Sequence, residues 1–368
     1  MSENMDSGNS DLEQLQRIAD DLYQHIDPLF NVYEMSYEAG SLYFYGIPRA
    51  DAKTIQKDLW TVFSQKGYQF SMGSQMGEDV IIASPAVEVK ERYWLNGLLA
   101  ILTFFTTMVA GAGMFGVDVV SDPVNVVKGL PFTLAIMAVL GSHEMGHYVV
   151  AKMHGMKTSL PYFIPFPTFI GTMGAIIKHR GPIPDRKSLF DVGVAGPLAG
   201  LVVSVAVTLI GLSLPPVTYA AQTSMIEFQE PILFSFLMGI MGHVGENVHP
   251  VAFAGWVGMF VTVLNLIPSG QLDGGHALRA MLGRRARFVS SLTPFALLVL
   301  GIYVSRVMGQ NGFVWIFWAL FLSFFAAAGH PDPLDDDVKL DKGRIAVGVF
   351  TFVLGILCFT LVPFTFVE

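Results

Sequence analysis

The chain has 368 residues, of which 52% are hydrophobic and only 14% are charged, and this balance predicts a membrane protein. Residues 1–92 contain 15 acidic and 7 basic residues, so they carry the whole formal charge of −8 and leave the remainder neutral. The missing basic face argues against nucleic-acid binding, and the single cysteine, Cys358, excludes an intramolecular disulfide and a cysteine zinc cluster.

Residues 1–90 predict a small soluble α+β domain. A charged amphipathic stretch at 11–24 precedes two runs with strand period, "NVYEMSYE" and "GSLYFYGI". A helical run at 51–67 follows, and "YQFSMG" and "EDVIIAS" then return to strand character. This order predicts a ββαββ or ferredoxin-like domain after a leading helix. Because no catalytic constellation is visible in it, we interpret it as a regulatory or docking domain that binds a regulator.

Residues 91–368 predict a transmembrane domain. Apolar spans of about 18 residues or more recur there, free of charged residues except for Glu144 in the second, and this is the length that a helix needs to cross hydrocarbon. The spans are 93–117, 129–151, 192–214, 250–272, 288–305, 307–329 and 345–367. We therefore expect a polytopic α-helical, multi-pass membrane protein with about six or seven transmembrane helices in the lipid bilayer. The apolar stretch 231–242 is too short to cross and predicts an interfacial or re-entrant helix.

The segment 159–187 is rich in proline and glycine and cannot form one long helix. We expect its "TMGAII" core to be a re-entrant extended segment in a protein-lined cavity. A plain packing loop remains the alternative.

The distribution of lysine and arginine predicts the orientation of the chain in the membrane. Basic residues follow the second span and the fourth span, whereas the loop 215–249 between them has none. Positive loops face the cytoplasm, so we expect the N-terminal domain to be cytoplasmic as well.

The sequence "HEMGH" lies inside the second span and fits the H-E-x-x-H pattern. Residues i and i+4 share one helical face, so His143 and His147 can hold one zinc ion, with Glu144 beside it to take a proton from water. Ionisable side chains in an apolar span are costly, which favours this function over a polar cluster without metal.

A hydrolytic zinc site needs a third protein ligand. His154 lacks the metzincin spacing and lies near the basic interface, whereas Asp273 stands at the end of the charge-free fourth span. His147 and Asp273 also lie at a similar depth, roughly 10 Å from the cytoplasmic face. We therefore predict Asp273 as the third ligand and an active site near the cytoplasmic face.

Three motifs, "HEMGH", "VAGPLAG" and "NLIPSGQLDGG", together resemble the site-2 protease family of intramembrane zinc metalloproteases. The resemblance covers a catalytic core of about 93–290 and extends to the archaeal and plastid branch, whose plant members are the ethylene-dependent gravitropism-deficient type. It implies one Zn²⁺ per chain bound by His143, His147 and Asp273, with Glu144 as general base. It also implies that Asn265 contacts the substrate carbonyl or the oxyanion, and a purely interhelical hydrogen bond is the alternative for this residue.

The predicted function is an intramembrane zinc endopeptidase that hydrolyses peptide bonds in or near transmembrane segments of membrane proteins, with a transmembrane-helix protein as its substrate. Two alternatives come from other classes of protein. One is a membrane metal transporter or sensor, which does not require a carboxylate directly after the first histidine. The other is an inactive membrane scaffold, which does not require an intact set of ligands and base.

Overall fold

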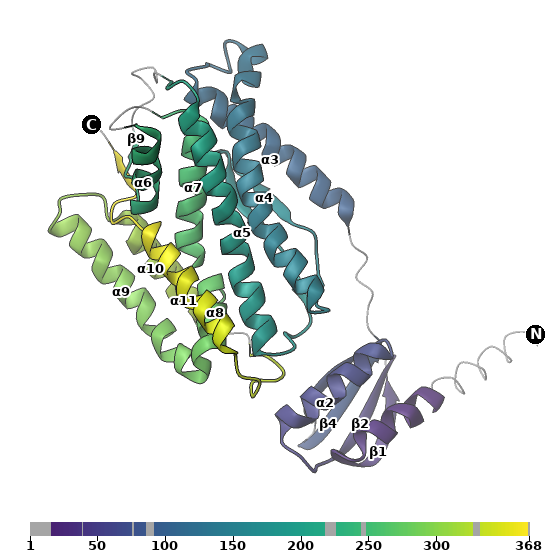
Figure 1. Cartoon of the computed structure of the whole chain (residues 1–368). Helices are drawn as coiled ribbons and strands as arrows, with labels where there is room; N and C mark the ends of the chain where they lie inside the picture. Colours follow the sequence, from purple (N-terminus) through teal and green to yellow (C-terminus); the bar gives the residue numbers. More distant parts are fainter. Residues whose placement is uncertain are drawn as a thin grey trace, which may run out of the picture. The chain divides into compact units, whose positions relative to one another are not determined.

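A computed structural model describes residues 16–38, 40–75, 77–85, 92–217, 226–243, 248–326 and 332–366 (Figure 1). The chain divides into two compact units, Met1–Lys90 and Glu91–Glu368. Each unit is built around its own hydrophobic core.

The N-terminal unit is a four-stranded antiparallel sheet with helices packed on it. Helical residues 16–26 precede β1 (Phe30–Glu38), β2 (Ser41–Pro48), α2 (Ala52–Gln65), β3 (Tyr68–Gln75) and β4 (Glu78–Pro85). The strand order is β1-β2-β4-β3. Leu22, Phe44 and Phe63 are fully buried where the helices meet the sheet. The predicted ββαββ order after a leading helix is thus confirmed, although residues 11–15 of the leading stretch lie outside the described residues.

The second unit is mostly helical. Its α-helices are α3 (Tyr93–Met114), α4 (Leu130–Met153), α5 (Arg186–Ser213), α6 (Ile232–Met241), α7 (Pro250–Asn265), α8 (Asp273–Leu282), α9 (Ala286–Arg306), α10 (Phe313–Ala326) and α11 (Lys342–Leu357). Two 3₁₀ helices, η1 (Pro123–Gly129) and η2 (Gly283–Arg285), precede α4 and α9. Its short strands are β5 (Lys157–Thr158), β6 (Tyr162–Pro165), β7 (Thr172–Ile176), β8 (His179–Arg180), β9 (Ile226–Phe228) and β10 (Phe364–Phe366).

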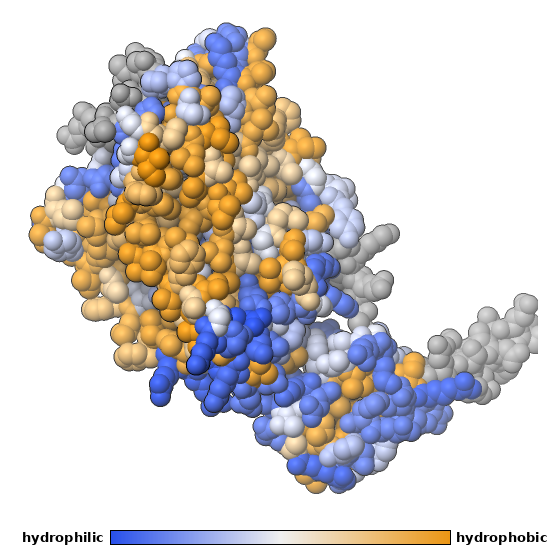
Figure 2. Space-filling model, in the orientation of Figure 1, coloured by the Kyte–Doolittle hydropathy of each residue, from blue (hydrophilic) through white to orange (hydrophobic). Residues whose placement is uncertain are grey.

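Four helical stretches are long and apolar enough to cross a membrane. They are Tyr93–Met114, Pro123–Met153, Arg186–Ser213 and Asp273–Arg306, and the shorter α6, α7 and α10 are also apolar. Each of the seven predicted spans contains one helix, namely α3, α4, α5, α7, α9, α10 or α11. Figure 2 shows hydrophobic side chains over the flanks of this unit and hydrophilic ones gathered towards its ends. The unit is therefore a membrane protein, and a count of six or seven crossings stays a prediction.

Two predicted spans end earlier than expected. Helix α7 stops at Asn265 instead of continuing to residue 272, since Pro268 cannot donate a helical hydrogen bond, and a turn then leads into α8. Helix α11 stops at Leu357, and β10 pairs with β9 in antiparallel register. The first of these breaks releases Asp273 from the end of a helix and makes it the first residue of another.

Small residues let α4, α5 and α7 pack closely around the centre of the unit. A Cβ atom added to Gly146 would lie 2.6 Å from the carbonyl oxygen of Ala195, and one on Gly258 would lie 2.0 Å from Oγ of Ser204. Such close approach of backbones is how helices associate in lipid. It holds α4, which carries the H-E-x-x-H motif, directly against α5.

Candidate metal centre

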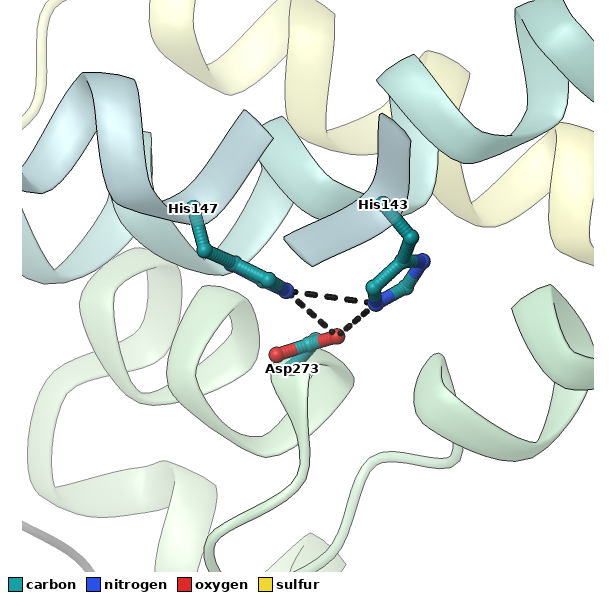
Figure 3. A group of neighbouring side chains, drawn as sticks. All are labelled: His143, His147 and Asp273. Atoms are coloured by element: carbon teal, nitrogen blue, oxygen red, sulfur yellow. Dashed lines mark hydrogen bonds and ion pairs between the residues drawn. The ribbon is translucent and has the colours of Figure 1, made fainter. Parts of the chain in front are cut away.

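Three side chains converge between α4 and α8 (Figure 3). His143 and His147 lie one turn apart on α4, and Asp273 begins α8. Nε2 of each histidine lies 3.2 Å from Oδ2 of Asp273, and the two Nε2 atoms are 3.2 Å from each other. Both histidines are almost completely buried. Asp273, and not His154, is therefore the third member of the cluster with the two histidines.

The donor set fits a divalent zinc-type ion. Ligands at about 2.0–2.1 Å from a tetrahedral ion are ~3.3 Å apart, close to the separations found here. Nδ1 of His147 donates to the carbonyl oxygen of Val192 over 2.8 Å, so in the neutral ring Nε2 carries a lone pair. That lone pair faces a carboxylate oxygen 3.2 Å away, and a divalent cation would bind both atoms. Imidazole with carboxylate is a ligand set that zinc accepts.

The "VAGPLAG" stretch of α5 forms the wall behind the histidines. A Cβ atom on Gly196 would lie 2.0 Å from Nε2 of His147, and one on Gly200 would lie 3.1 Å from Nδ1 of His143. This stretch thus packs closely through its small residues. Its glycines also make room for the imidazole rings themselves.

Glu144 lies in the same cavity as the three converging residues. The cavity has a volume of about 510 Å³ and is lined by residues of α4, α7, α8 and the β7–β8 segment. Glu144 is 8% exposed, and its carboxylate accepts a hydrogen bond from the backbone N–H of Ile177, just after β7. The predicted extended segment is therefore present as β7, which pairs with β6, and its end lines the cavity.

The other polar residues lie either in the lining of the cavity or away from it. Asn265 lines the cavity, with Nδ2 3.2 Å from Nε2 of His143. His154 lies elsewhere, because its Nε2 is 2.9 Å from the Asp191 carboxylate and its Nδ1 is 3.1 Å from Oγ of Ser188. His179 and His276 also line the cavity. His179 follows Ile177 by two residues, the spacing at which side chains of an extended segment share one side, and this spacing is the signal that would have pointed to His179.

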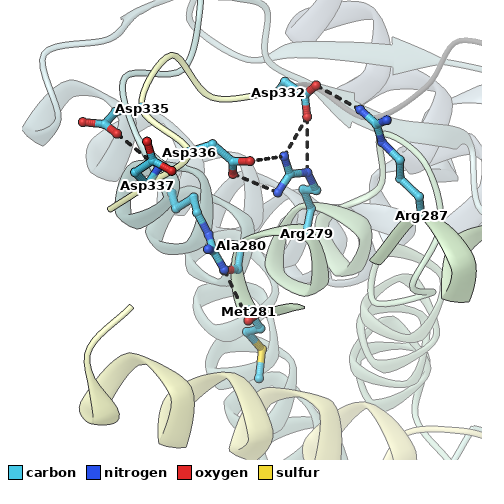
Figure 4. A network of polar contacts seen from close by, with 9 residues as sticks. Arg279, Ala280, Met281, Arg287, Asp332, Asp335, Asp336 and Asp337 are labelled. Carbon is cyan, nitrogen blue, oxygen red and sulfur yellow. Dashed lines mark hydrogen bonds and ion pairs between the residues drawn. The ribbon is translucent and has the colours of Figure 1, made fainter. Parts of the chain in front are cut away.

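Residues 332–337, here called the acidic strap, form ion pairs with a buried arginine of α8 (Figure 4). The Arg279 guanidinium on α8 is 1% exposed and donates to Asp332 and Asp336 over 2.8–3.3 Å. The backbone N–H groups of Leu334 and Asp335 donate to the carbonyls of Ile183 and Pro184. Asp332 itself lines the cavity. The acidic strap thus ties α8, which presents Asp273, to the segment that leads into α5.

We expect Arg279→Met to destabilise the protein, because it leaves two aspartates facing an apolar side chain at a buried position. The free energy of unfolding should fall by about 3 kcal/mol, the range found when one partner of a buried ion pair is removed. Arg287→Met is the control, since Arg287 is 60% exposed and pairs with Asp332 alone. Its effect should stay within about 0.5 kcal/mol. Denaturant titration in mild detergent measures both, and equal values would contradict the structural role of the acidic strap.

Comparison with known proteins relates this arrangement to a peptidase family. Residues 131–304 match the model of peptidase family M50. The chain is 31% identical over 247 residues to a rice protein (Oryza sativa subsp. japonica) described as probable zinc metalloprotease EGY1, chloroplastic, covering 64% of this chain and 41% of the relative. It is 27% identical over 362 residues to Arabidopsis thaliana EGY2, described in the same terms, covering 92% and 63%. The chain therefore spans about two fifths to two thirds of the length of these relatives.

A solved structure, the site-2 protease from Methanocaldococcus jannaschii, aligns with a TM-score of 0.35 at 17% identity, covering 66% of this chain and 91% of that one. The matched residues 131–304 contain the H-E-x-x-H motif, Asn265 and Asp273. The candidate metal centre thus lies in the part of the chain that matches peptidase family M50. The resemblance that the motifs predicted is therefore confirmed over residues 131–304, which match peptidase family M50.

Proposed function

We propose that this protein is an intramembrane zinc endopeptidase that cuts peptide bonds in or near transmembrane segments of other membrane proteins. The observation that carries the proposal is the convergence of His143, His147 and Asp273 beside Glu144, in a cavity between apolar helices. The zinc metalloprotease descriptions of the relatives support it. A polar cluster with only a structural role would not need a second carboxylate, that of Glu144, next to the three metal-binding side chains.

The residues divide the chemistry among them. His143, His147 and Asp273 would hold one zinc ion, which when bound polarises a carbonyl and lowers the pKa of water. Glu144 accepts the proton of the attacking water and later delivers it to the leaving amine. The side-chain amide of Asn265 donates to the carbonyl oxygen of the scissile bond.

The β7 strand offers an edge with which a substrate segment can pair. A transmembrane helix has its backbone groups paired internally, so it must unwind before a peptide bond can react. We infer that the unwound segment pairs with β7 on the edge away from β6, in the manner of β-strand addition. Ala175 and Ile176 line the cavity, so a segment in that position passes the metal centre.

The membrane setting follows from the distribution of charge. With basic loops on the cytoplasmic side, the metal centre lies near the cytoplasmic face of a protein with six or seven crossings. We propose that the acidic N-terminal unit binds a regulator on that same side.

Metal removal tests the proposal. Purified protein in liposomes should cleave a single-pass reporter, lose more than about 90% of its rate with a chelator such as 1,10-phenanthroline, and recover with added zinc because the ligands are protein side chains. Cleavage that persists without metal contradicts a zinc hydrolase. Zinc uptake into the liposomes without reporter cleavage would instead identify the transporter, and neither activity would identify the scaffold.

A further inference from the structure

His179 lies on the strand side of the metal cavity. Ile177 and His179 both line the cavity, whereas Lys178 between them does not. Nζ of Lys178 instead lies 5.4 Å from the centre of the Tyr162 ring. Successive side chains of extended backbone point to opposite sides, so the direction of Lys178 independently places His179 towards the cavity.

The backbone around His179 is held on both sides. His179 pairs with Thr158 in the β5–β8 ladder, and the N–H of Ser159 donates to the carbonyl of Lys178 over 3.0 Å. The N–H of Lys178 in turn donates to Oγ of Ser159 over 3.0 Å. The imidazole therefore projects from a fixed segment, which is what a preorganised hydrogen-bond donor needs.

The electrostatic interactions of His179 also place it near the metal centre. Its ring interacts with both His147 and Asp273, so it is close to the metal centre. A neutral imidazole carries one N–H, which can donate a hydrogen bond into the cavity.

His179 supplies the cavity with a polar group that the helices do not provide on that side. Glu144, Asn265 and Asp273 come from α4, α7 and α8, and His276 also comes from α8. The strand segment contributes the apolar Ala175, Ile176 and Ile177 and then His179. A substrate paired along β7 would lie between this segment and the helices.

We propose that His179 is a further catalytic residue, whose imidazole N–H donates a hydrogen bond to the scissile carbonyl oxygen as negative charge develops on it. The inference rests on the proposed endopeptidase function. No proton is transferred in this step, because the ring keeps its N–H throughout. Together with Asn265 on α7, His179 would hold the oxygen from two different elements of the fold.

Steady-state cleavage of the single-pass reporter tests the proposal with His179→Ala and His179→Gln. We expect His179→Ala to lower kcat by about 100-fold while KM changes less than about twofold, since the bond strengthens only in the transition state. His179→Gln should recover about a tenth or more of the kcat, because its amide retains an N–H donor. Bound zinc, measured by mass spectrometry of the metal, should stay at the wild-type level in both.

Lys178→Ala is the matched control, since its side chain points away from the cavity, and it should leave kcat unchanged. Wild-type kcat in His179→Ala, or a loss of zinc equal to the loss of rate, overturns the catalytic role and leaves the endopeptidase standing. A wild-type protein that does not cut the reporter overturns both proposals. A Gln variant as slow as the Ala variant also contradicts hydrogen-bond donation.

Discussion

Glu144→Gln should abolish reporter cleavage while the protein still binds zinc. The amide has the shape of the carboxylate and can still accept the hydrogen bond from the N–H of Ile177, so the cavity should keep its form. It cannot take a proton from water, and loss of a general base costs about 1,000-fold in rate. Initial rates in liposomes, with zinc content measured on the same samples, give both quantities.

Glu230→Gln is the control for this substitution, because Glu230 is exposed and hydrogen-bonded to Ser235, away from the cavity. It should cleave at the wild-type rate. A Glu144→Gln protein that cuts as fast as Glu230→Gln would remove Glu144 from the mechanism. If Glu144→Gln instead lost its zinc, the residue would serve the metal centre and its role as base would be unsupported.

Gly196→Ala should remove both zinc and activity, although Gly196 contributes no ligand atom. The new methyl group would lie 2.0 Å from Nε2 of His147, 2.4 Å from Cδ2 and 2.5 Å from Cε1. The ring cannot turn aside without breaking its 2.8 Å hydrogen bond to the carbonyl of Val192. Since catalytic geometry tolerates displacements of only about 0.5 Å, we expect zinc affinity and cleavage to fall at least ~100-fold.

Substitutions at two other glycines serve as graded comparisons for the loss of zinc. A Cβ on Gly200 would meet His143 at 3.1 Å, so Gly200→Ala should give a smaller loss, and Gly113 on α3 has open space around it, so Gly113→Ala should be neutral. Zinc binding in competition with a chromophoric chelator ranks the three variants. Full zinc occupancy in Gly196→Ala would show that the ring has another position from which to bind, contrary to the packing described here.

The local sequence was sufficient to predict the helices and strands and most of the residues of the candidate metal centre. The i and i+4 spacing alone puts His143 and His147 on one helical face, and the costly placement of charge in an apolar span singles out Glu144 and Asp273. The periodicity of apolar residues likewise predicts the ββαββ unit, and the length of the apolar spans predicts the helices of the second unit. It overestimated α7, because hydropathy measures length in hydrocarbon and does not detect where a proline ends a helix. It also overestimated α11, after which the chain continues to β10.

The amino-acid sequence by itself thus determined a membrane protein with a histidine pair and its neighbouring carboxylate, since these depend on spacing along a single helix. Only the tertiary structure decided that Gly196 stands against His147, that the acidic strap closes on Arg279 and that His179 faces the cavity. Each of these is a contact between residues far apart in the chain. Such contacts depend on how helices and strands pack, which the periodicity of any one segment does not contain.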